Sequence, residues 1–301
     1  MKPLRVALVH RDNPRAMEHR SVGWWAYPVP EFVWTHVPVS NGFVLDVRDL
    51  ARKHDLVVWE DHRAYGTLTN RDALPIAYVI VDSTAGQAQF DMRYEYARQA
   101  DLLLVDHDQP GRFSGLGKRA RRLGYCVNDQ FYRDYGEEKT VDVCFHFHPS
   151  PDGARTRLHE WLDGFCKQRG YVYAGGKRSG EEYPRGFNRA KVSVNLCQTP
   201  TNRPHRVFDS MACRTCLLTS KLPYVSGEED VREGVHYADF TDTEDCGRRI
   251  VALLELGAWQ GMADAAHELV MRRYTWTALA GRLRQTLLDE FPQLAKEGVT
   301  A

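Results

Sequence analysis

Arg206 and Asp209 are the two residues of this sequence whose types and spacing best fit a binding chemistry. In a helix, side chains three positions apart share one face, so the guanidinium and the carboxylate would lie side by side. A guanidinium can bind a phosphate through two hydrogen bonds, and a carboxylate at a helix start can accept hydrogen bonds from both hydroxyls of a diol. The pair therefore fits a phosphorylated ligand that carries a diol. The alternative is an ion pair on a helix surface, worth roughly a few tenths of a kcal/mol.

Further basic side chains lie near this pair in the sequence or follow a neighbouring strand. His205 could hydrogen-bond the same phosphates, and Arg203 lies two positions before it. Lys177 follows a strand-like segment at 171–174, so its ammonium could reach a diphosphate or a base from the opposite loop. A solvated turn is the alternative for Lys177. The predicted ligand-binding set is Arg206, Asp209, His205, Arg203 and Lys177.

Two aspartates in the first half of the chain are candidates for a general base. Asp82 follows the apolar segment 76–81, and Asp12 follows the first predicted strand, which also contains His10. Ligands of α/β proteins bind at the carboxyl ends of the strands, where these side chains should lie. A carboxylate or imidazole there can take a proton from a reacting hydroxyl. Asp82 could instead cap the next segment as a helix N-cap, and His10 and Asp106 rank behind the two aspartates.

Two short patterns that could hold a metal are interpreted otherwise. The D-x-D of Asp106 and Asp108 follows a predicted strand and offers carboxylate oxygens, which suit a hard divalent cation. Acidic residues commonly follow the strands of α/β proteins, however, so we expect an ordinary loop there. His146 and His148 share one face of a predicted strand, where we expect them to line a polar loop. We therefore predict no bound metal and no resident cofactor.

The elements that must position these residues alternate between strands and helices. Apolar segments of strand length, rich in Val, Ile and Leu, are typical of parallel strands buried on both faces. Helical patterns at 92–99, 155–168 and 204–213 lie between several of them, which predicts βαβ units. The predicted fold class is therefore α/β with parallel sheets. The strand segments are 5–10, 56–59, 76–81, 102–105, 141–147, 192–196 and 216–218.

Composition limits the classes of protein that remain. The 301 residues suggest two α/β domains of about 130–150 residues each. The 40 basic and 40 acidic residues give a formal net charge of zero, so no overall field attracts nucleic acid or an anionic membrane. Seven irregularly spaced cysteines argue against a disulfide framework, and no apolar run approaches the ~20 residues of a membrane span. We therefore expect a cytoplasmic protein.

The second half of the chain contains several motifs that recur together in one protein family. The run RVFDSMAC at 206–213 precedes an apolar strand and matches the pattern R-x-F-E-A-x-A-C. The strand at 141–147 with Arg155 after it, and Tyr274-Thr275-Trp276 near the end, fit the same family. Its "Y…N..K…N" stretch is matched by Tyr183, Asn188, Lys191 and Asn195. Residues 141–288 thus resemble the donor domain of GT-B glycosyltransferases of group 1, more narrowly the branch related to the spore maturation protein CgeB.

This resemblance implies a GT-B fold, in which two Rossmann-like domains with parallel sheets face a central cleft. The expected bounds are 1–138 for an acceptor-side domain, 139–273 for the donor domain and 274–301 for a helix that packs back towards the first domain. The implied activity is transfer of a sugar from a nucleoside-diphosphate sugar, with UDP as the implied nucleotide, to an acceptor hydroxyl. Asp209 would bind the ribose and Arg206 the diphosphate. Because Arg206 and a helix N-terminus would neutralise the negative charge of the nucleotide-sugar diphosphate, the transfer should need no metal.

Three departures from the family pattern leave alternatives open. Thr201 stands where related retaining enzymes carry a Glu, so we predict an inverting reaction. Asp209 replaces the usual Glu and Arg214 the usual Gly, which leaves a non-catalytic nucleotide-binding protein with a degenerate donor domain as one alternative. The acceptor is open between a small molecule, a glycan and hydroxylated bases of phage-type DNA. A basic cluster would hold the DNA, unless it is a solvated helix face; it consists of Arg112, Lys118, Arg119, Arg121 and Arg122.

Overall fold

The chain folds into two compact units. Residues up to Tyr125, together with those from Thr277 on, belong to the first unit, and Cys126–Trp276 form the second. The second unit thus begins before residue 139, where the sequence analysis starts the donor domain. The computed structural model describes residues 2–11, 29–60, 66–80, 93–105, 115–117, 119–123, 126–149, 152–197, 204, 206–222 and 230–296.

The first unit is built on a parallel sheet in the order β2-β1-β4-β6-β7-β8. Its strands are β1 (Leu4–Arg11), β2 (Phe32–Val39), β4 (Leu56–Glu60), β6 (Ile76–Ile80), β7 (Leu102–Val105) and β8 (Arg119–Arg122). A small parallel sheet pairs β3 (Phe43–Asp46) with β5 (Gly66–Thr69). Short helices α2 (Val47–Ala51) and η2 (Arg71–Ala73) connect these strands, and α9 (Trp276–Glu290) and α10 (Gln293–Lys296) bring the end of the chain to this unit.

One face of the first sheet carries an aromatic core. Trp59 packs edge-on against Phe43, Tyr78 and Tyr96, with ring centroids 5.0–5.6 Å apart. The central strands β4 and β6 are buried at every position, as expected of a parallel sheet that is covered on both faces. Burial of this apolar surface is what holds the carboxyl ends of the strands in register.

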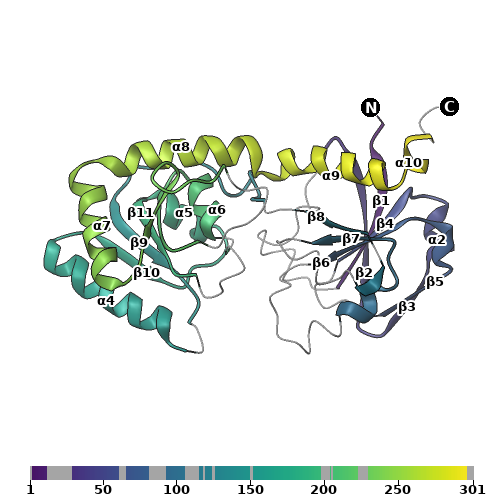
Figure 1. Cartoon of the computed structure of the whole chain (residues 1–301), viewed down its shortest axis with the longest axis horizontal. Helices are drawn as coiled ribbons and strands as arrows, with labels where there is room; N and C mark the ends of the chain where they lie inside the picture. Colours follow the sequence, from purple (N-terminus) through teal and green to yellow (C-terminus); the bar gives the residue numbers. More distant parts are fainter. Residues whose placement is uncertain are drawn as a thin grey trace. The chain divides into compact units, whose positions relative to one another are not determined.

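The second unit has a five-stranded parallel sheet in the order β10-β9-β11-β12-β13. Its strands are β9 (Val141–His146), β10 (Tyr173–Gly176), β11 (Ala190–Asn195), β12 (Cys216–Ser220) and β13 (Tyr237–Phe240). Its helices are α4 (Ala154–Arg169), α5 (Glu182–Asn188), α6 (Arg206–Ala212), α7 (Thr243–Glu255) and α8 (Ala258–Arg273). Helices α4 and α7 cover one face of the sheet, and α5 and α6 lie against the other (Figure 1).

In each of the two larger sheets the order in which the chain adds strands changes side once, and this point determines where a ligand can bind. In the second unit the chain adds β10 on one side of β9 and then β11 on the other. In the first unit β1 lies in the same way between β2 and β4. Loops leave in opposite directions at such a switch point, so the carboxyl ends of β9 and β11, and of β1 and β4, border the crevice in which α/β proteins bind ligands.

Several local predictions from the sequence need correction. Residues Arg119–Arg122 form the edge strand β8, so the predicted helix face is wrong there. The segment Phe32–Val39, in which exposed and buried residues alternate only loosely, is a full strand that the apolar pattern did not indicate. At Tyr274–Trp276, the backbone N–H of Val127 donates to the oxygen of Tyr274 and its oxygen accepts from the N–H of Trp276, where α8 gives way to α9. In the described part of the chain, every helix is too short or too polar to span a bilayer.

Candidate functional site

Three polar side chains lie at the carboxyl edge of the second sheet on the face that α5 and α6 cover. His146 and Asn195 end the neighbouring strands β9 and β11, Thr219 is the last residue but one of β12, and all three are buried. Asn195 donates from Nδ2 to Thr219 Oγ1 over 2.8 Å. Its Oδ1 accepts a hydrogen bond from Nε of Arg206 over 3.2 Å. The sheet therefore fixes the guanidinium of Arg206 directly above the switch point.

Arg206 is the first residue of α6, and one edge of its guanidinium is hydrogen-bonded while another nitrogen is not. Its Nε is bound to Asn195, whereas its Nη2 is buried and has no hydrogen-bond partner among the described residues. A buried guanidinium nitrogen without a partner is costly, because its hydration is lost and not replaced. A ligand oxygen at this position would replace it.

Asp209 lies one turn further along α6, and it is buried rather than exposed. Only 6% of its surface is accessible, so the alternative of a surface ion pair with Arg206 is wrong. Burial raises the pKa of Asp209 well above its ordinary range, and the positive charge of Arg206 opposes that rise. Burial raises the pKa of the phenols of Tyr132 and Tyr183, and the nearby carboxyl group of Asp209 adds to this rise. Helix α6 therefore holds the carboxyl group of Asp209 in a buried position close to Arg206 and the two phenols.

His146 is a deeply buried group of the site. Its ring is 1% exposed and packs on Phe187 with centroids 5.0 Å apart. The backbone of Gly176 and Gly186 lies near the ring, but neither ring nitrogen makes a well-formed hydrogen bond to a described residue. Burial, with the positive charges of Arg178 and Arg206, lowers the pKa of His146 to about 4. The imidazole is therefore neutral near pH 7 and can both donate and accept one hydrogen bond.

Further cations surround Arg206 and His146. Arg155, in the first turn of α4, donates from Nη1 to the backbone oxygen of His148 over 3.4 Å. Burial and the nearby Arg206 lower the pKa of Arg155 to about 10. The pKa of His148 is lowered by burial and then by Lys177, Arg206 and Arg155. We refer to Arg155, Lys177, Arg178 and Arg206 as the basic cluster.

The basic cluster can bind a multiply charged anion. Arg155 and Arg206 repel one another across a half-buried site, and the charge of Arg206 contributes to the lowered pKa of Arg155. An anion that accepts hydrogen bonds from both would remove this repulsion and give Nη2 of Arg206 a partner. The carboxyl ends of β9 and β11 border the site, and α6 begins there. The arrangement is suited to a diphosphate.

Two residues of the predicted motifs have structural roles instead. Asn188 binds the backbone of Tyr135, Arg133 and Pro184 and so ties the start of the second unit to α5. Lys191 pairs with Asp142 over 2.7 Å on neighbouring strands. Of the predicted set, the structure brings Arg206, Asp209 and Lys177 to one edge of the sheet. Arg203, His205, Thr201, Asp12, Asp82 and the D-x-D at 106–108 lie outside the described residues.

The first unit has its own polar edge at the switch point. His10 in β1 lies against His36 in β2, with Nε2 and Nδ1 3.3 Å apart. Glu60, the last residue of β4, is buried with 4% of its surface exposed. Sequence reasoning missed Glu60 because the apolar segment was taken to end at Trp59, although an acidic residue directly after such a segment is the same signal that selected Asp82.

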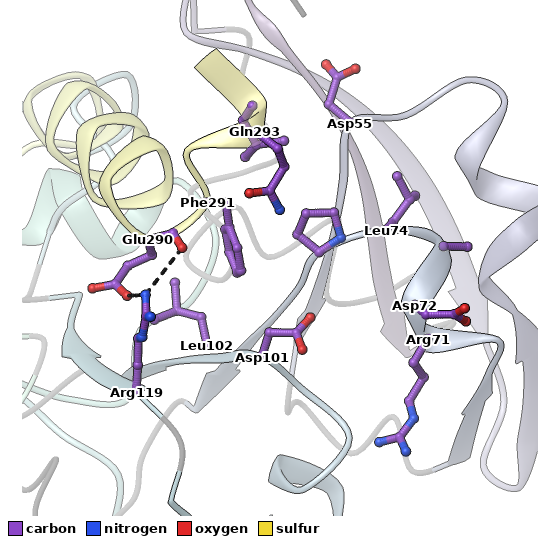
Figure 2. Close-up of a pocket in the computed structure, with 13 residues that line it drawn as sticks. Asp55, Arg71, Asp72, Leu74, Asp101, Leu102, Arg119, Glu290, Phe291 and Gln293 are labelled. Carbon is purple, nitrogen blue, oxygen red and sulfur yellow. Dashed lines mark hydrogen bonds and ion pairs between the residues drawn. The ribbon is translucent and has the colours of Figure 1, made fainter. Parts of the chain in front are cut away.

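A cavity of 580 Å³ in the first unit is not a candidate for this site. Figure 2 shows that Asp55 and Asp101, which precede β4 and β7, line it together with Phe291 from the end of the chain. It therefore opens at the amino ends of the strands, opposite to the edge at which α/β sheets bind ligands. Glu290 beside it pairs with Arg119 and Arg121 over 2.9 and 2.5 Å. This pairing neutralises part of the basic patch that was considered for a DNA acceptor; Arg112 and Lys118 lie outside the described residues.

Most of the second unit is similar to a known domain family. Residues 139–285 match the family model described as glycosyl transferase-like. No curated protein matches the chain by sequence.

Solved glycosyltransferase structures share the fold across both units. HepE of Anabaena in complex with UDP-glucose is 12% identical, and the match covers 95% of this chain and 100% of that chain with a TM-score of 0.61. Sucrose-phosphate synthase from Thermosynechococcus elongatus is 10% identical, with 96% and 100% covered and a TM-score of 0.56. The pneumococcal O-GlcNAc transferase GtfA is 10% identical, with 81% of this chain and 59% of that chain covered and a TM-score of 0.53. The predicted α/β fold of GT-B type is confirmed, and the predicted activity is confirmed at the level of the domain family.

Proposed function

We propose that this chain is a glycosyltransferase whose second unit binds a nucleoside-diphosphate sugar at the carboxyl edge of its sheet. The glycosyl transferase-like domain and the basic cluster at the switch point support this proposal. HepE and GtfA were solved with UDP, so UDP-glucose is the first donor to test. The motifs at 183–195 and 206–213 favour the branch related to CgeB.

One observation carries the proposal: two buried donors of the basic cluster have no hydrogen-bond partner among the described residues. They are Nη2 of Arg206 and Nε of Arg178. Both guanidinium groups lie close enough to His146 to contribute to the lowered pKa of its ring. A diphosphate supplies several acceptor oxygens and at least two negative charges, which match this set in number and sign.

The chemistry follows from where the charge develops. When the acceptor oxygen bonds to the anomeric carbon, the bond from that carbon to the β-phosphate oxygen breaks, and the electron pair leaves with the nucleoside diphosphate. Arg206 and Arg155 would stabilise this growing charge because they are already fixed and partly desolvated. Asp209 would accept hydrogen bonds from the ribose hydroxyls. The proton of the acceptor hydroxyl passes to a base.

Two finer points belong to the proposal. Because the basic cluster and the start of α6 would neutralise the donor diphosphate, the transfer would need no metal, and the D-x-D at 106–108 would be an ordinary loop. Because Thr201 replaces a Glu associated with retention, the reaction would invert the anomeric carbon, with a base from the first unit: Asp82, Asp12 or His10. NMR analysis of the anomeric configuration of the product tests inversion, and retention would refute it.

Calorimetric titration with UDP-glucose tests the donor site. Arg206→Ala and Arg155→Ala should each weaken binding at least about tenfold, since each removes a charged hydrogen bond to phosphate. Arg157→Ala is the matched control: this exposed arginine lies on α4 two positions after Arg155 and binds only the backbone of Asp152 in the described structure. Equal affinity in all three variants would contradict the assignment. Binding without turnover on any acceptor would favour the non-catalytic alternative.

A further inference from the structure

The proposed reaction gives no role to His146, although its ring occupies a specific buried position at the site. Its ring stands at the carboxyl end of β9, buried to 1% exposure between the sheet and α5. Gly186 on α5 leaves room for it, because a Cβ at that position would clash with Nε2 of the ring and would lie 2.9 Å from Cδ of Arg178. A buried polar ring that a helix accommodates with a glycine, and whose two nitrogens make no well-formed hydrogen bond to a described residue, points to a ligand.

The groups that face His146 come from every element packed against it. Arg178 from the loop after β10 and Arg206 from α6 are the nearest cations. Tyr183 and Phe187 of α5 contribute rings with centroids 6.1 and 5.0 Å away. Asp209, the acidic group of α6, lies near Tyr183. Burial, together with these positive charges, lowers the pKa of His146 and keeps the imidazole neutral as long as no anion is bound.

We propose that His146 is a further residue of the donor site, which hydrogen-bonds the diphosphate and takes up a proton when the nucleotide sugar binds. The proposal rests on the donor site described above. Two negative charges next to the ring offset the potential that the two arginines create, and a phosphate oxygen bonded to the ring favours the charged imidazole in the complex. The second ring nitrogen, protonated on binding, adds a charge-assisted hydrogen bond. The proton comes from solvent, and no covalent bond changes.

The direction of the pH dependence follows from this uptake. If the complex binds more protons than the free protein, the affinity for UDP-glucose increases as the pH falls from about 7 to about 5. The pyrophosphate diester of UDP-glucose does not titrate in this range. Free UDP does, through its terminal phosphate, and is therefore the wrong probe.

Calorimetric titration with UDP-glucose near pH 6, in two buffers with different heats of ionisation, measures the protons taken up. We expect uptake by the wild type, loss of uptake with weaker binding in His146→Gln, and persistent uptake in His148→Gln. His148 is the matched control because it lies two positions away, is exposed, and also faces Arg206. Should His146→Gln not fold, histidine-selective NMR of the wild type with and without UDP-glucose reports the protonation of this ring directly.

The outcomes separate this inference from the proposed function. Binding of UDP-glucose without proton uptake, or with uptake that disappears only in His148→Gln, overturns the role of His146 and leaves the donor site standing. Absence of any binding to the wild type overturns the proposed donor, and the role of His146 with it.

Discussion

The deeply buried ring of His146 should make the stability of the second unit depend on pH. Its pKa is about 4 in the folded chain and about 6.5 in an unfolded one. The unfolded chain therefore binds the proton more tightly, so the stabilisation is fully present above about pH 6.5 and is lost as the pH falls towards about 4. The loss amounts to about 3 kcal/mol at most. Urea denaturation at several pH values should show a flatter profile in His146→Asn; an unchanged slope would contradict the neutral buried state.

The sequence could identify Arg206 but not its surroundings. Arg206 and Asp209 were found from spacing, because residues three apart on a helix are neighbours whatever the fold. That Asp209 is buried, and that Asn195 holds Arg206, depends on how α6 packs on β11, and no local pattern contains this information. The same holds for His146, which sequence analysis could place only in a polar loop.

At the scale of elements, the fit of α5 against β9 predicts a sharp difference between two helical glycines. Gly186→Ala places a methyl group against the His146 ring and should cost about 1–3 kcal/mol of unfolding free energy and weaken UDP-glucose binding. Gly164→Ala is the control, since nothing lies within 4 Å of its Cβ on α4. It should stabilise the protein by about 0.5–1 kcal/mol. Thermal and urea denaturation compare the two, and equal effects would show that α5 does not constrain the ring.

Arg214, which stands where the family usually has glycine, ends α6 in a left-handed conformation with φ of 54°. This backbone costs a non-glycine residue about 1 kcal/mol. Its guanidinium offsets part of the cost through Asp264 at 2.6 Å on α8 and Asp134 at 3.2 Å. These pairs are partly exposed and worth at most about 1 kcal/mol. The departure is therefore compensated locally and gives no support to a degenerate domain.

The prediction for this position is an order of stabilities. Arg214→Ala keeps the backbone cost and loses the ion pairs, so it should be less stable than the wild type by about 1 kcal/mol. Arg214→Gly loses the pairs but also the backbone cost, so it should stay within about 0.5 kcal/mol of the wild type. Urea denaturation gives the order. A glycine variant less stable than the alanine variant would contradict this account.

Elements with strong apolar patterns were predictable, and polar elements were not. The central strands β4, β6 and β9 follow from their runs of Val, Ile and Leu, because both faces of a parallel sheet are buried. β8, with the sequence RARR, reads as a charged surface segment; it is a strand because β7 offers it an unpaired edge. Such a pairing is a property of the sheet and not of the segment.

At the scale of the whole molecule, the order of elements carries the functional argument. Two parallel sheets, each with one switch point, were predictable as a class from the alternation of strands and helices. Their strand order was not, since a parallel connection can add a strand on either side of its neighbour. This order places β9 beside β11 and so brings Arg155, His146 and Arg206 together from three separate segments.

The most direct test is a crystal structure of the protein grown with UDP-glucose in the presence of EDTA. The account predicts the diphosphate at the carboxyl edge of β9 and β11, with an oxygen within hydrogen-bond distance of Nη2 of Arg206 and the ribose hydroxyls at Asp209. A nucleotide bound at the carboxyl edge of the first sheet would contradict the assignment of the donor site. A nucleotide that binds only after manganese replaces EDTA would contradict the metal-free donor site.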